Sequence, residues 1–262
     1  MTAAVQSRRI AAVVGALVAD ASAQPIHWNY NVNKLDALLR DATEVAFWEP
    51  SANPFYKLPL GSQSCYGDQS FVILKSLVEN GGLNMEHLKQ STFDWFGPKS
   101  QYENPTNAVY KIKTDAEKAT TYPIEGPWRH FSIKDFIKNI LEEKPTTGSE
   151  TDAQMDCTLR IVSVVALYAG RPEMLDKAEE VIRSTQNSDT SVAVGLAAAR
   201  LLEYYILNGK MEDAVDHVIE DLSSQNRKNA QDLDKALASF LREVLRKRDE
   251  PHIKTARTFR ID

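Results

Sequence analysis

The sequence predicts an all-α fold, and three observations support this. Apolar residues recur at three- and four-residue spacing in most segments, as on one face of a helix. Glycine and proline end these segments, which is typical of helix boundaries. No stretch alternates apolar and polar residues as a half-buried strand would. With 262 residues, no repeat period and no evident interior linker, we interpret residues 1–262 as one multi-helix domain.

The first helix is expected over Ile10–Ala21, ending before Pro25. It is small and apolar on nearly every side, so we expect it to lie centrally in the core. A signal peptide is the alternative interpretation, but the apolar run is short and continues into Asp20. A second helix is expected over Val32–Asp41, followed by an irregular stretch over residues 43–67 whose length is typical of a functional loop.

The rest of the chain continues the helical pattern. Helices are expected over Gln69–Glu79, Met85–Phe96, Asn107–Ala119, a segment capped by Ser132, Gln154–Ala169, Glu173–Ser184, Ser188–Asn208, Met211–Leu222 and Ala230–Arg248.

Composition excludes several functional classes. The net charge is −5, and the one dense basic run, Arg242–Arg248, is interpreted as a solvated helix end, so we expect no nucleic-acid partner. No apolar stretch approaches the ~20 residues that span a bilayer, so we expect no membrane partner. Two isolated cysteines, Cys65 and Cys157, form neither a disulfide framework nor a zinc motif. They favour a cytoplasmic protein.

The segment Gly67-Asp68-Gln69-Ser70 is the clearest functional signal. It follows a loop and begins an apolar helix, where side-chain oxygens and backbone N–H groups converge. Such a position suits an anion, or a metal held through a carboxylate. The alternative is an ordinary helix cap. Asp68 is the only carboxylate in this cluster.

Three segments, in this order along the chain, resemble the ADP-ribosylglycohydrolase family. Gly15–Asp20 resembles the opening Gly-x-x-x-Gly-Asp helix, Tyr66–Ser70 falls where hydrolases carry Thr-Asp-Asp-Thr, and Thr185–Asn187 falls where they carry Thr-His. Further segments resemble the branch that contains the J-type lens crystallins and selenoprotein J, namely Asn53–Tyr56, Ile124–Arg129 and Val165–Gly170. The resemblance implies an all-α fold whose active members hold two Mg²⁺ ions and ADP-ribose in a cleft.

The chain departs from this pattern where metal chemistry needs charge. Gly67 replaces a threonine, Gln69 replaces the second aspartate, and His27 replaces a glutamate after the first helix. Gln154-Met155-Asp156 stands where a flexible Gly-Asn-Gly is expected. The closing Asp-x-Asp-Thr cluster is not found after Asn208, so we expect a domain that lacks its C-terminal portion; the alternative is a chain that has lost this half of the site. If helices are missing, exposed apolar surface predicts self-association.

The resemblance implies a set of candidate site residues. Asp68 is the candidate catalytic residue, and Asp68, Gln69 and Ser70 would form a degenerate metal site for weak or absent Mg²⁺. Candidate contacts to an ADP-ribose-like ligand are Asp20, His27, Asp156, Arg160, Gln186 and Asn187. The alternatives are a helix-terminal hydrogen bond for Asp20, a satisfied buried histidine for His27, and an outward-reaching side chain for Arg160.

Three functional hypotheses follow. The first is a catalytically weak or inactive ADP-ribosylglycohydrolase homologue with a structural role, like an eye lens crystallin, or a ligand-binding role. The second is a Mg²⁺-dependent hydrolase that removes ADP-ribose from modified protein or a related ribosyl substrate. The third is an interaction scaffold that uses the Arg242–Arg248 helix.

Overall fold

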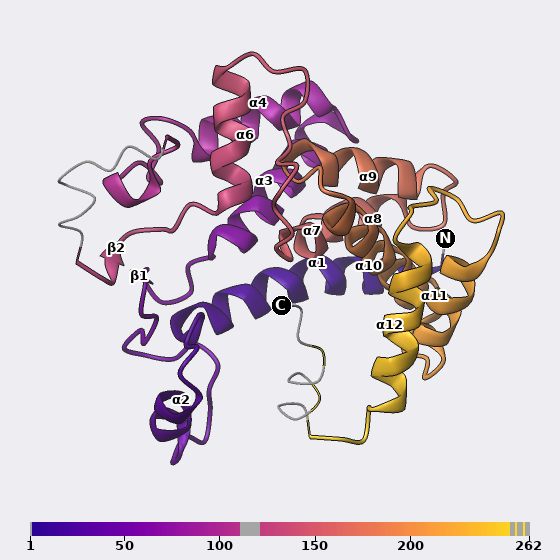
Figure 1. Cartoon of the computed structure of the whole chain (residues 1–262), viewed down its shortest axis with the longest axis horizontal. Coiled ribbons are helices and arrows are strands. Elements are labelled where there is room, and N and C mark those ends of the chain that lie inside the picture. Colours follow the sequence, from indigo (N-terminus) through magenta and orange to yellow (C-terminus); the bar gives the residue numbers. More distant parts are fainter. Residues whose placement is uncertain (1, 111–120, 252–254, 256–258, 260–262) are drawn as a thin grey trace.

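A computed structural model describes residues 2–110, 121–251, 255 and 259. The regular structure of the described chain is almost entirely helical, as predicted (Figure 1). The helices are α1 (Ala3–Ala23), α2 (Val32–Leu39), α3 (Cys65–Asn80), α4 (Met85–Phe96), α6 (Phe131–Leu141), α7 (Asp156–Arg160), α8 (Val162–Tyr168), α9 (Met174–Thr185), α10 (Asp189–Asn208), α11 (Ala214–Ser223) and α12 (Asp234–Arg246). Two 3₁₀ turns, η1 (Gln24–Ile26) and η2 (Pro105–Asn107), and two short strands, β1 (Tyr56–Lys57) and β2 (Ile124–Glu125), complete it.

The core forms around α8 and α10, which pack against α1, α3, α7 and α9. Gly195 of α10 shows how closely these helices approach. A β-carbon there would lie 2.6 Å from Cδ1 of Ile182 and 3.2 Å from Cβ of Cys157. Glycine at this position therefore lets α10 pack directly on α7 and α9. Cys157 is fully buried, and burial raises the pKa of its thiol to about 12, as expected for a core cysteine.

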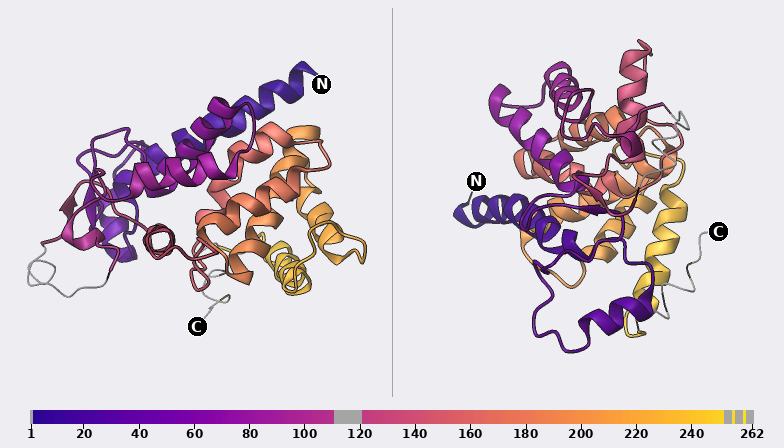
Figure 2. Two further views of the ribbon diagram at one scale, coloured as in Figure 1. Left: turned by 90° about the horizontal axis from the view of Figure 1, so that it is seen from above. Right: turned by 90° about the vertical axis from the view of Figure 1, so that its left-hand side faces the viewer.

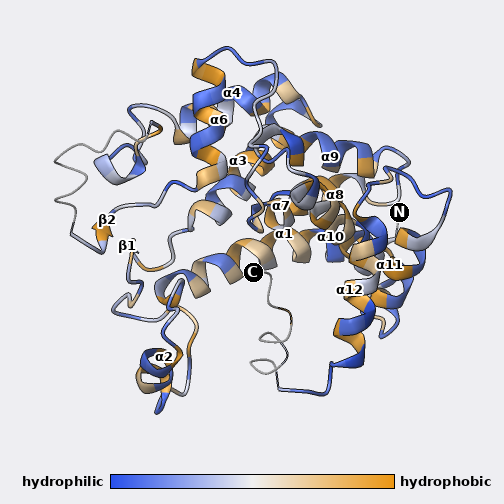
Figure 3. Cartoon of the chain, viewed as in Figure 1, coloured by the Kyte–Doolittle hydropathy of each residue, from blue (hydrophilic) through white to orange (hydrophobic). Residues whose placement is uncertain are grey.

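The C-terminal pair α11 and α12 forms a second, smaller apolar cluster against α10. Its buried members are Ala197, Val218, Ile219, Leu222 and Ala238. Figure 3 shows apolar residues concentrated in the central helices, with polar and apolar residues mixed along α12. The helix expected over Ala230–Arg248 is thus confirmed, although it begins only at Asp234 and ends at Arg246.

Two parallel two-residue strands join the long irregular stretch to the segment before α6. Tyr56 pairs with Ile124, and Lys57 pairs with Glu125. Strands this short do not make a β layer, but they hold two aromatic loops side by side (Figure 1).

The predicted position of the first helix was wrong. α1 begins at Ala3, and its large residues Ile10, Val14 and Val18 are 57%, 53% and 50% exposed. Figure 2 places α1 at the margin of the molecule. A helix that is apolar on every side gives no indication of which sides the fold covers, and here the rest of the described chain covers only one.

Three other expectations differ from the structure. Ser132 does not cap its helix, because α6 begins at Phe131 with His130 at the N-cap and Ser132 lies within the first turn. The segment Gln154–Ala169 is not one helix, because it divides into α7 and α8 at Ile161. Of the helix expected over Asn107–Ala119, residues 111–120 lie outside the described residues, and Asn107 ends η2.

Two described segments, Ala3–Ile26 and Asp189–Asn208, are long and apolar enough to cross a membrane by length and composition. α10 lies within the core and α1 packs on it through one side, as helices of a soluble protein do.

Candidate functional site

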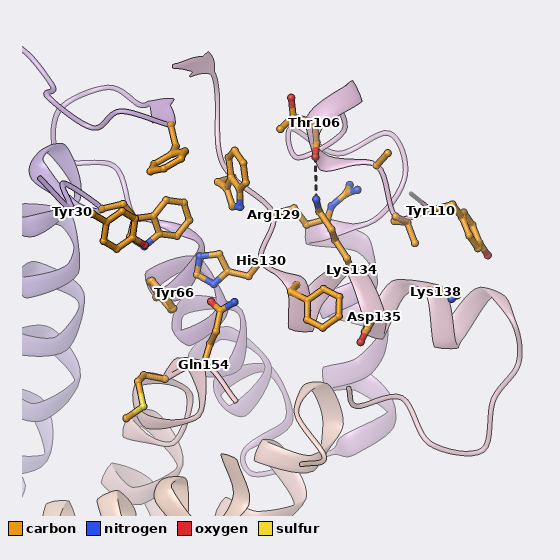
Figure 4. Close-up of a pocket in the computed structure, with 17 residues that line it drawn as sticks. Tyr30, Tyr66, Thr106, Tyr110, Arg129, His130, Lys134, Asp135, Lys138 and Gln154 are labelled. Carbon is orange, nitrogen blue, oxygen red and sulfur yellow. Dashed lines mark hydrogen bonds between the residues drawn. The ribbon is translucent and has the colours of Figure 1, made fainter. Parts of the chain in front are cut away.

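A pocket of about 980 Å³ opens beside the N-terminal end of α3 (Figure 4). It is lined by aromatic rings on one side and by lysines of α6 on the other. The lining residues are Trp28, Tyr30, Phe55, Tyr66, Thr106, Ala108, Val109, Tyr110, Trp128, Arg129, His130, Phe131, Lys134, Asp135, Lys138, Gln154 and Met155. Six separate chain segments contribute, so the fold itself forms the pocket.

Trp28 is the centre of the aromatic wall. Its ring centroid lies 5.7 Å from those of Phe55 and Trp128 and 5.6 Å from that of His130. The edge-on contacts with Phe55 and Trp128 are a favourable arrangement for aromatic pairs. Trp28 also has φ 60°, a left-handed conformation that costs a bulky residue about 1–3 kcal/mol. The surrounding rings hold this strained residue in place, which is typical of functional sites.

The opposite wall is cationic. Lys134 lies with Nζ 5.9 Å from the ring centroid of Trp128, and Nζ donates to the carbonyl oxygen of Thr106 at 3.0 Å (Figure 4). Lys138 lines the pocket one helical turn further along α6. Arg129 is fully buried, and its guanidinium donates to the carbonyl of Asn107 and to the carboxylate of Glu103. The positive charge of Arg129 is therefore already paired with a carboxylate of the protein.

His130 connects the pocket to a buried polar cluster beneath it. Nδ1 of His130 lies 3.0 Å from Oδ2 of Asp156, which also accepts hydrogen bonds from Ser132 Oγ at 3.0 Å and Gln69 Nε2 at 2.8 Å. Burial alone would raise the pKa of Asp156, but His130 and these donors lower it to about 2. Asp156 is therefore an ionised carboxylate whose Oδ2 already has three partners, while its buried Oδ1 accepts no hydrogen bond from the described residues.

Asp20 lies at the N-terminal end of α3. Its Oδ1 accepts from Ser64 Oγ at 2.6 Å, and its Oδ2 accepts from the backbone N–H of Ser64 at 2.7 Å. The backbone of Gly67 also hydrogen-bonds to this carboxylate. The anion position predicted at the start of this helix is thus filled by the protein's own aspartate. A β-carbon at Gly67 would lie 2.3 Å from Asp20 Oδ2, so the threonine of the hydrolase motif does not fit here.

Asp68, the candidate catalytic residue, points to a different neighbour. Its Oδ2 accepts from the hydroxyl of the buried Tyr102 at 2.6 Å. Burial raises the pKa of Asp68 despite this hydrogen bond. The adjacent Gln69 turns its amide to Asp156, and Ser70 is buried within α3.

The other candidate residues also have internal partners. His27 lies beside the pocket with Nδ1 3.3 Å from the hydroxyl of Tyr56, and burial lowers its pKa to about 4. Arg160 donates to the carbonyl of Val181 and to Ser184.

Gln186 and Asn187 lie behind the polar cluster rather than in the pocket. The amide of Gln186 donates to Asp152 Oδ1 at 3.1 Å, and Asn187 Oδ1 accepts from Arg183 at 2.7 Å. None of the candidate residues predicted from the sequence lines the pocket itself.

Sequence reasoning missed the residues that do line it. Trp128 lies in the Ile124–Arg129 segment, whereas Trp28, His130 and Lys134 lie in none of the segments that carry the family resemblance. The sequence offered one signal for His130 and Lys134, because the Gly-Pro-Trp-Arg run at the end of Ile124–Arg129 directly precedes this part of the chain.

The residues present do not fit a two-metal centre. Mg²⁺ needs several oxygen ligands in near-octahedral array. Asp20, Asp68 and Asp156 each bond to a different neighbour. Within residues 2–110, 121–251, 255 and 259, no group of three histidine, cysteine or acidic side chains is arranged to hold a metal ion.

Comparisons with known proteins give consistent matches. A family model described as ADP-ribosylglycohydrolase matches residues 1–259. Crystallin J1A of Tripedalia cystophora is 34% identical over 223 residues, which is 85% of this chain. Crystallin J1B of the same organism is 34% identical over 224 residues, which is 86% of this chain. In each case the match spans 66% of the relative's own length.

Proposed function

Because this chain belongs to the ADP-ribosylglycohydrolase family and has J-crystallin relatives, we propose that it binds a ligand but is weakly active or inactive in hydrolysis. One observation carries the proposal: the polar groups that metal chemistry would need are bonded to one another and to the backbone. Asp20 bonds to Ser64 at the start of α3, Asp68 bonds to Tyr102, and Gln69 bonds to Asp156.

The free-energy cost of breaking these buried hydrogen bonds supports the loss of the metal centre. A metal ion that took Asp156 Oδ2 would break the hydrogen bonds that this atom accepts, leaving donors such as Ser132 and Gln69 buried without a partner. Each such loss costs about 1–3 kcal/mol, and more where a charge is involved. Asp68 already accepts a hydrogen bond from Tyr102, so a metal ion would have to compete with that hydroxyl for the carboxylate oxygen. We derive no catalytic step through Mg²⁺.

The pocket supports an ADP-ribose-like ligand. Faces of Trp28 and Trp128 offer stacking surface for a flat heteroaromatic ring. Lys134 and Lys138 stand across the pocket, where a phosphate group would meet positive charge. Ligand binding of this kind is compatible with a structural, crystallin-like role for an abundant protein. We further propose that residues 1–262 act as one domain in the cytoplasm, which the two buried free thiols support.

Thermal unfolding tests the proposal directly. We expect ADP-ribose to raise the melting temperature equally in Mg²⁺ and in chelator, because a ligand that binds only the folded state stabilises it by mass action. Trp128→Ala should abolish this shift. Trp48→Ala is the matched control, because Trp48 lies outside this pocket.

Two results would contradict the proposal in different ways. If ADP-ribose does not change the melting temperature, the proposed ligand binding is wrong and only the structural role remains. Mg²⁺-dependent release of ADP-ribose from modified protein, lost in Asp68→Ala, would replace the proposal with the hydrolase hypothesis.

A further inference from the structure

His130 brings one open ring nitrogen to the pocket. It directly precedes α6 and lines the cavity, where Figure 4 shows its imidazole among the lining side chains. The side chain is 3% exposed, so the protein packs around nearly all of it. Within the described residues Nε2 nevertheless has no hydrogen-bond partner, and it is not among the enclosed polar atoms that lack one. Nε2 is therefore accessible to a ligand.

The other ring nitrogen determines what Nε2 can do. Nδ1 lies 3.0 Å from Oδ2 of Asp156. Asp156 has a pKa of about 2 and is ionised at neutral pH, and an ionised carboxylate only accepts hydrogen bonds. The proton of the neutral imidazole must then lie on Nδ1, because that nitrogen is the donor. Nε2 is left with a lone pair and acts as an acceptor.

The pair of His130 and Asp156 is held in one orientation. Ser132 Oγ and Gln69 Nε2 donate to the same carboxylate oxygen, at 3.0 Å and 2.8 Å. The ring of Tyr66 packs edge-on against the imidazole, with centroids 4.0 Å apart. Packing and hydrogen bonds of this kind fix the direction of a polar group in a site. The acceptor at Nε2 is therefore oriented before any ligand arrives.

The charges around the imidazole favour a hydrogen-bond donor over an anion at Nε2. Asp156 places an ionised carboxylate behind the ring, and Asp20 and Asp152 also lie within electrostatic range of it. Negative charge nearby attracts the positive end of an O–H or N–H group and repels a phosphate. Lys134 and Lys138, across the pocket, are where a phosphate would meet positive charge.

We propose that Nε2 of His130 determines which ligand the pocket accepts, by receiving a hydrogen bond from an N–H or O–H group of that ligand. The inference rests on the proposed ligand-binding role and adds the chemistry that the ligand must carry at this point. Two parts of an ADP-ribose-like molecule carry such a donor, namely the amino group of the flat ring and the hydroxyls of the sugars. A ligand with an acceptor oxygen in the same place would face the lone pair of Nε2 and bind more weakly.

Dissociation constants of related probes identify the donor. They are measured by calorimetry at pH 8 in chelator, for three pairs of probes. ADP-ribose is compared with inosine diphosphate ribose, which has an oxygen in place of the amino group, and with ADP, which lacks the terminal sugar. ADP is compared with dideoxy-ADP, which lacks the hydroxyls of the remaining ribose. We expect one pair to differ by about fivefold or more, which is the effect of losing one hydrogen bond.

His130→Asn tests whether this nitrogen is responsible. The asparagine amide can still donate to Asp156, but it places no acceptor at the position of Nε2. The affinity ratio of the discriminating pair should fall at least fivefold, while the circular dichroism spectrum is unchanged. His87→Asn is the matched control, because His87 is a partly exposed histidine outside the pocket and its replacement should leave every ratio as it is.

Nitrogen-15 NMR of the wild-type imidazole tests the same role without a variant. At pH 8 the ring should be protonated at Nδ1 and not at Nε2, and ADP-ribose should shift the Nε2 resonance. A ring protonated at Nε2, or ratios that His130→Asn leaves unchanged, would overturn the role of His130 while leaving ligand binding in place. A wild-type chain that binds none of the probes would overturn the proposed function, and the role of His130 with it.

Discussion

Asp68 and Asp156 are both buried carboxylates, yet their surroundings shift their pKa values in opposite directions. Asp68 has one hydroxyl donor, and burial raises its pKa. Asp156 has His130 and two further donors, which lower its pKa to about 2. Gln69 accounts for part of this difference. Gln69 can donate to Asp156, whereas a second carboxylate there would repel it.

Asp68→Asn should stabilise the protein near neutral pH. A raised native pKa means that the stabilising contribution of Asp68 is full below its unfolded value of 3.8 and is lost as pH rises through the native value. The amide carries no charge to desolvate, and its oxygen can still accept from Tyr102. Urea unfolding at pH 7.5 and pH 4 should show a gain at the higher pH that shrinks at the lower. Asp249→Asn, at a carboxylate side chain 96% exposed, serves as control.

Asp156→Asn should have the opposite effect at neutral pH. The lowered native pKa of about 2 stabilises the folded state above the unfolded value of 3.8, and this contribution disappears as pH falls from about 4 to about 2. The difference corresponds to roughly 2 kcal/mol. Unfolding free energies measured between pH 7 and pH 2 should converge for wild type and variant at the acid end. Parallel curves would mean that His130 does not hold Asp156 ionised.

At the scale of elements, hydrogen bonds from Ser64 to Asp20 connect the N-terminal end of α3 to the C-terminal part of α1. This contact explains why Gly67 is required, since any side chain there would displace the carboxylate. It also explains a limit of sequence reasoning. The sequence placed Asp20 near a helix end and Gly67 at a helix start, and a motif could mark both as important. Only the packing of the two helices shows that the Asp20 carboxylate leaves room for no side chain at position 67.

Gly67→Ala should therefore destabilise the protein through Asp20. Overpacking a close contact costs about 1–3 kcal/mol. Asp20→Ala should cost a similar amount, because it leaves the Ser64 N–H and the Gly67 backbone without their acceptor. In the double variant the carboxylate is gone and only the flexible end of Gln63, whose Oε1 lies 2.0 Å from the added carbon, has to move, so the combined cost should be smaller than the sum of the two single costs. Chemical denaturation of the wild type, the two single variants and the double variant measures this coupling. If the two single costs add exactly, Gly67→Ala does not act through Asp20.

At the scale of the molecule, helical periodicity and Gly/Pro boundaries were sufficient to predict the fold class and most helices. They could not show that α1 is peripheral, because an apolar helix without a polar face has no orientation signal. The site was harder still. Tyr102 and Asp68 are 34 positions apart, and Gln69 and Asp156 are 87 apart, so their pairing depends on long-range packing. The aromatic pocket likewise depends on the two-residue strand pair that brings its loops together.

The two apolar clusters predict unequal local stability within the described chain. α8 buries six side chains, from Val162 to Tyr168, whereas α12 buries only Asp234 and Ala238. Segments with few buried contacts open at lower free energy than the core. Amide hydrogen exchange should therefore be at least tenfold faster in residues 234–246 than in residues 162–168.

The link between the clusters can be weakened selectively. Arg200 of α10 is buried and bonds through Nε to Asp221 of α11 at 2.6 Å. Arg200→Met removes this ion pair while keeping most of the apolar volume, so exchange in α11 and α12 should accelerate while α8 keeps its protection. Arg246→Met, at a side chain 77% exposed, should change neither region. Equal acceleration in α8 after Arg200→Met would mean that both clusters unfold as one cooperative unit.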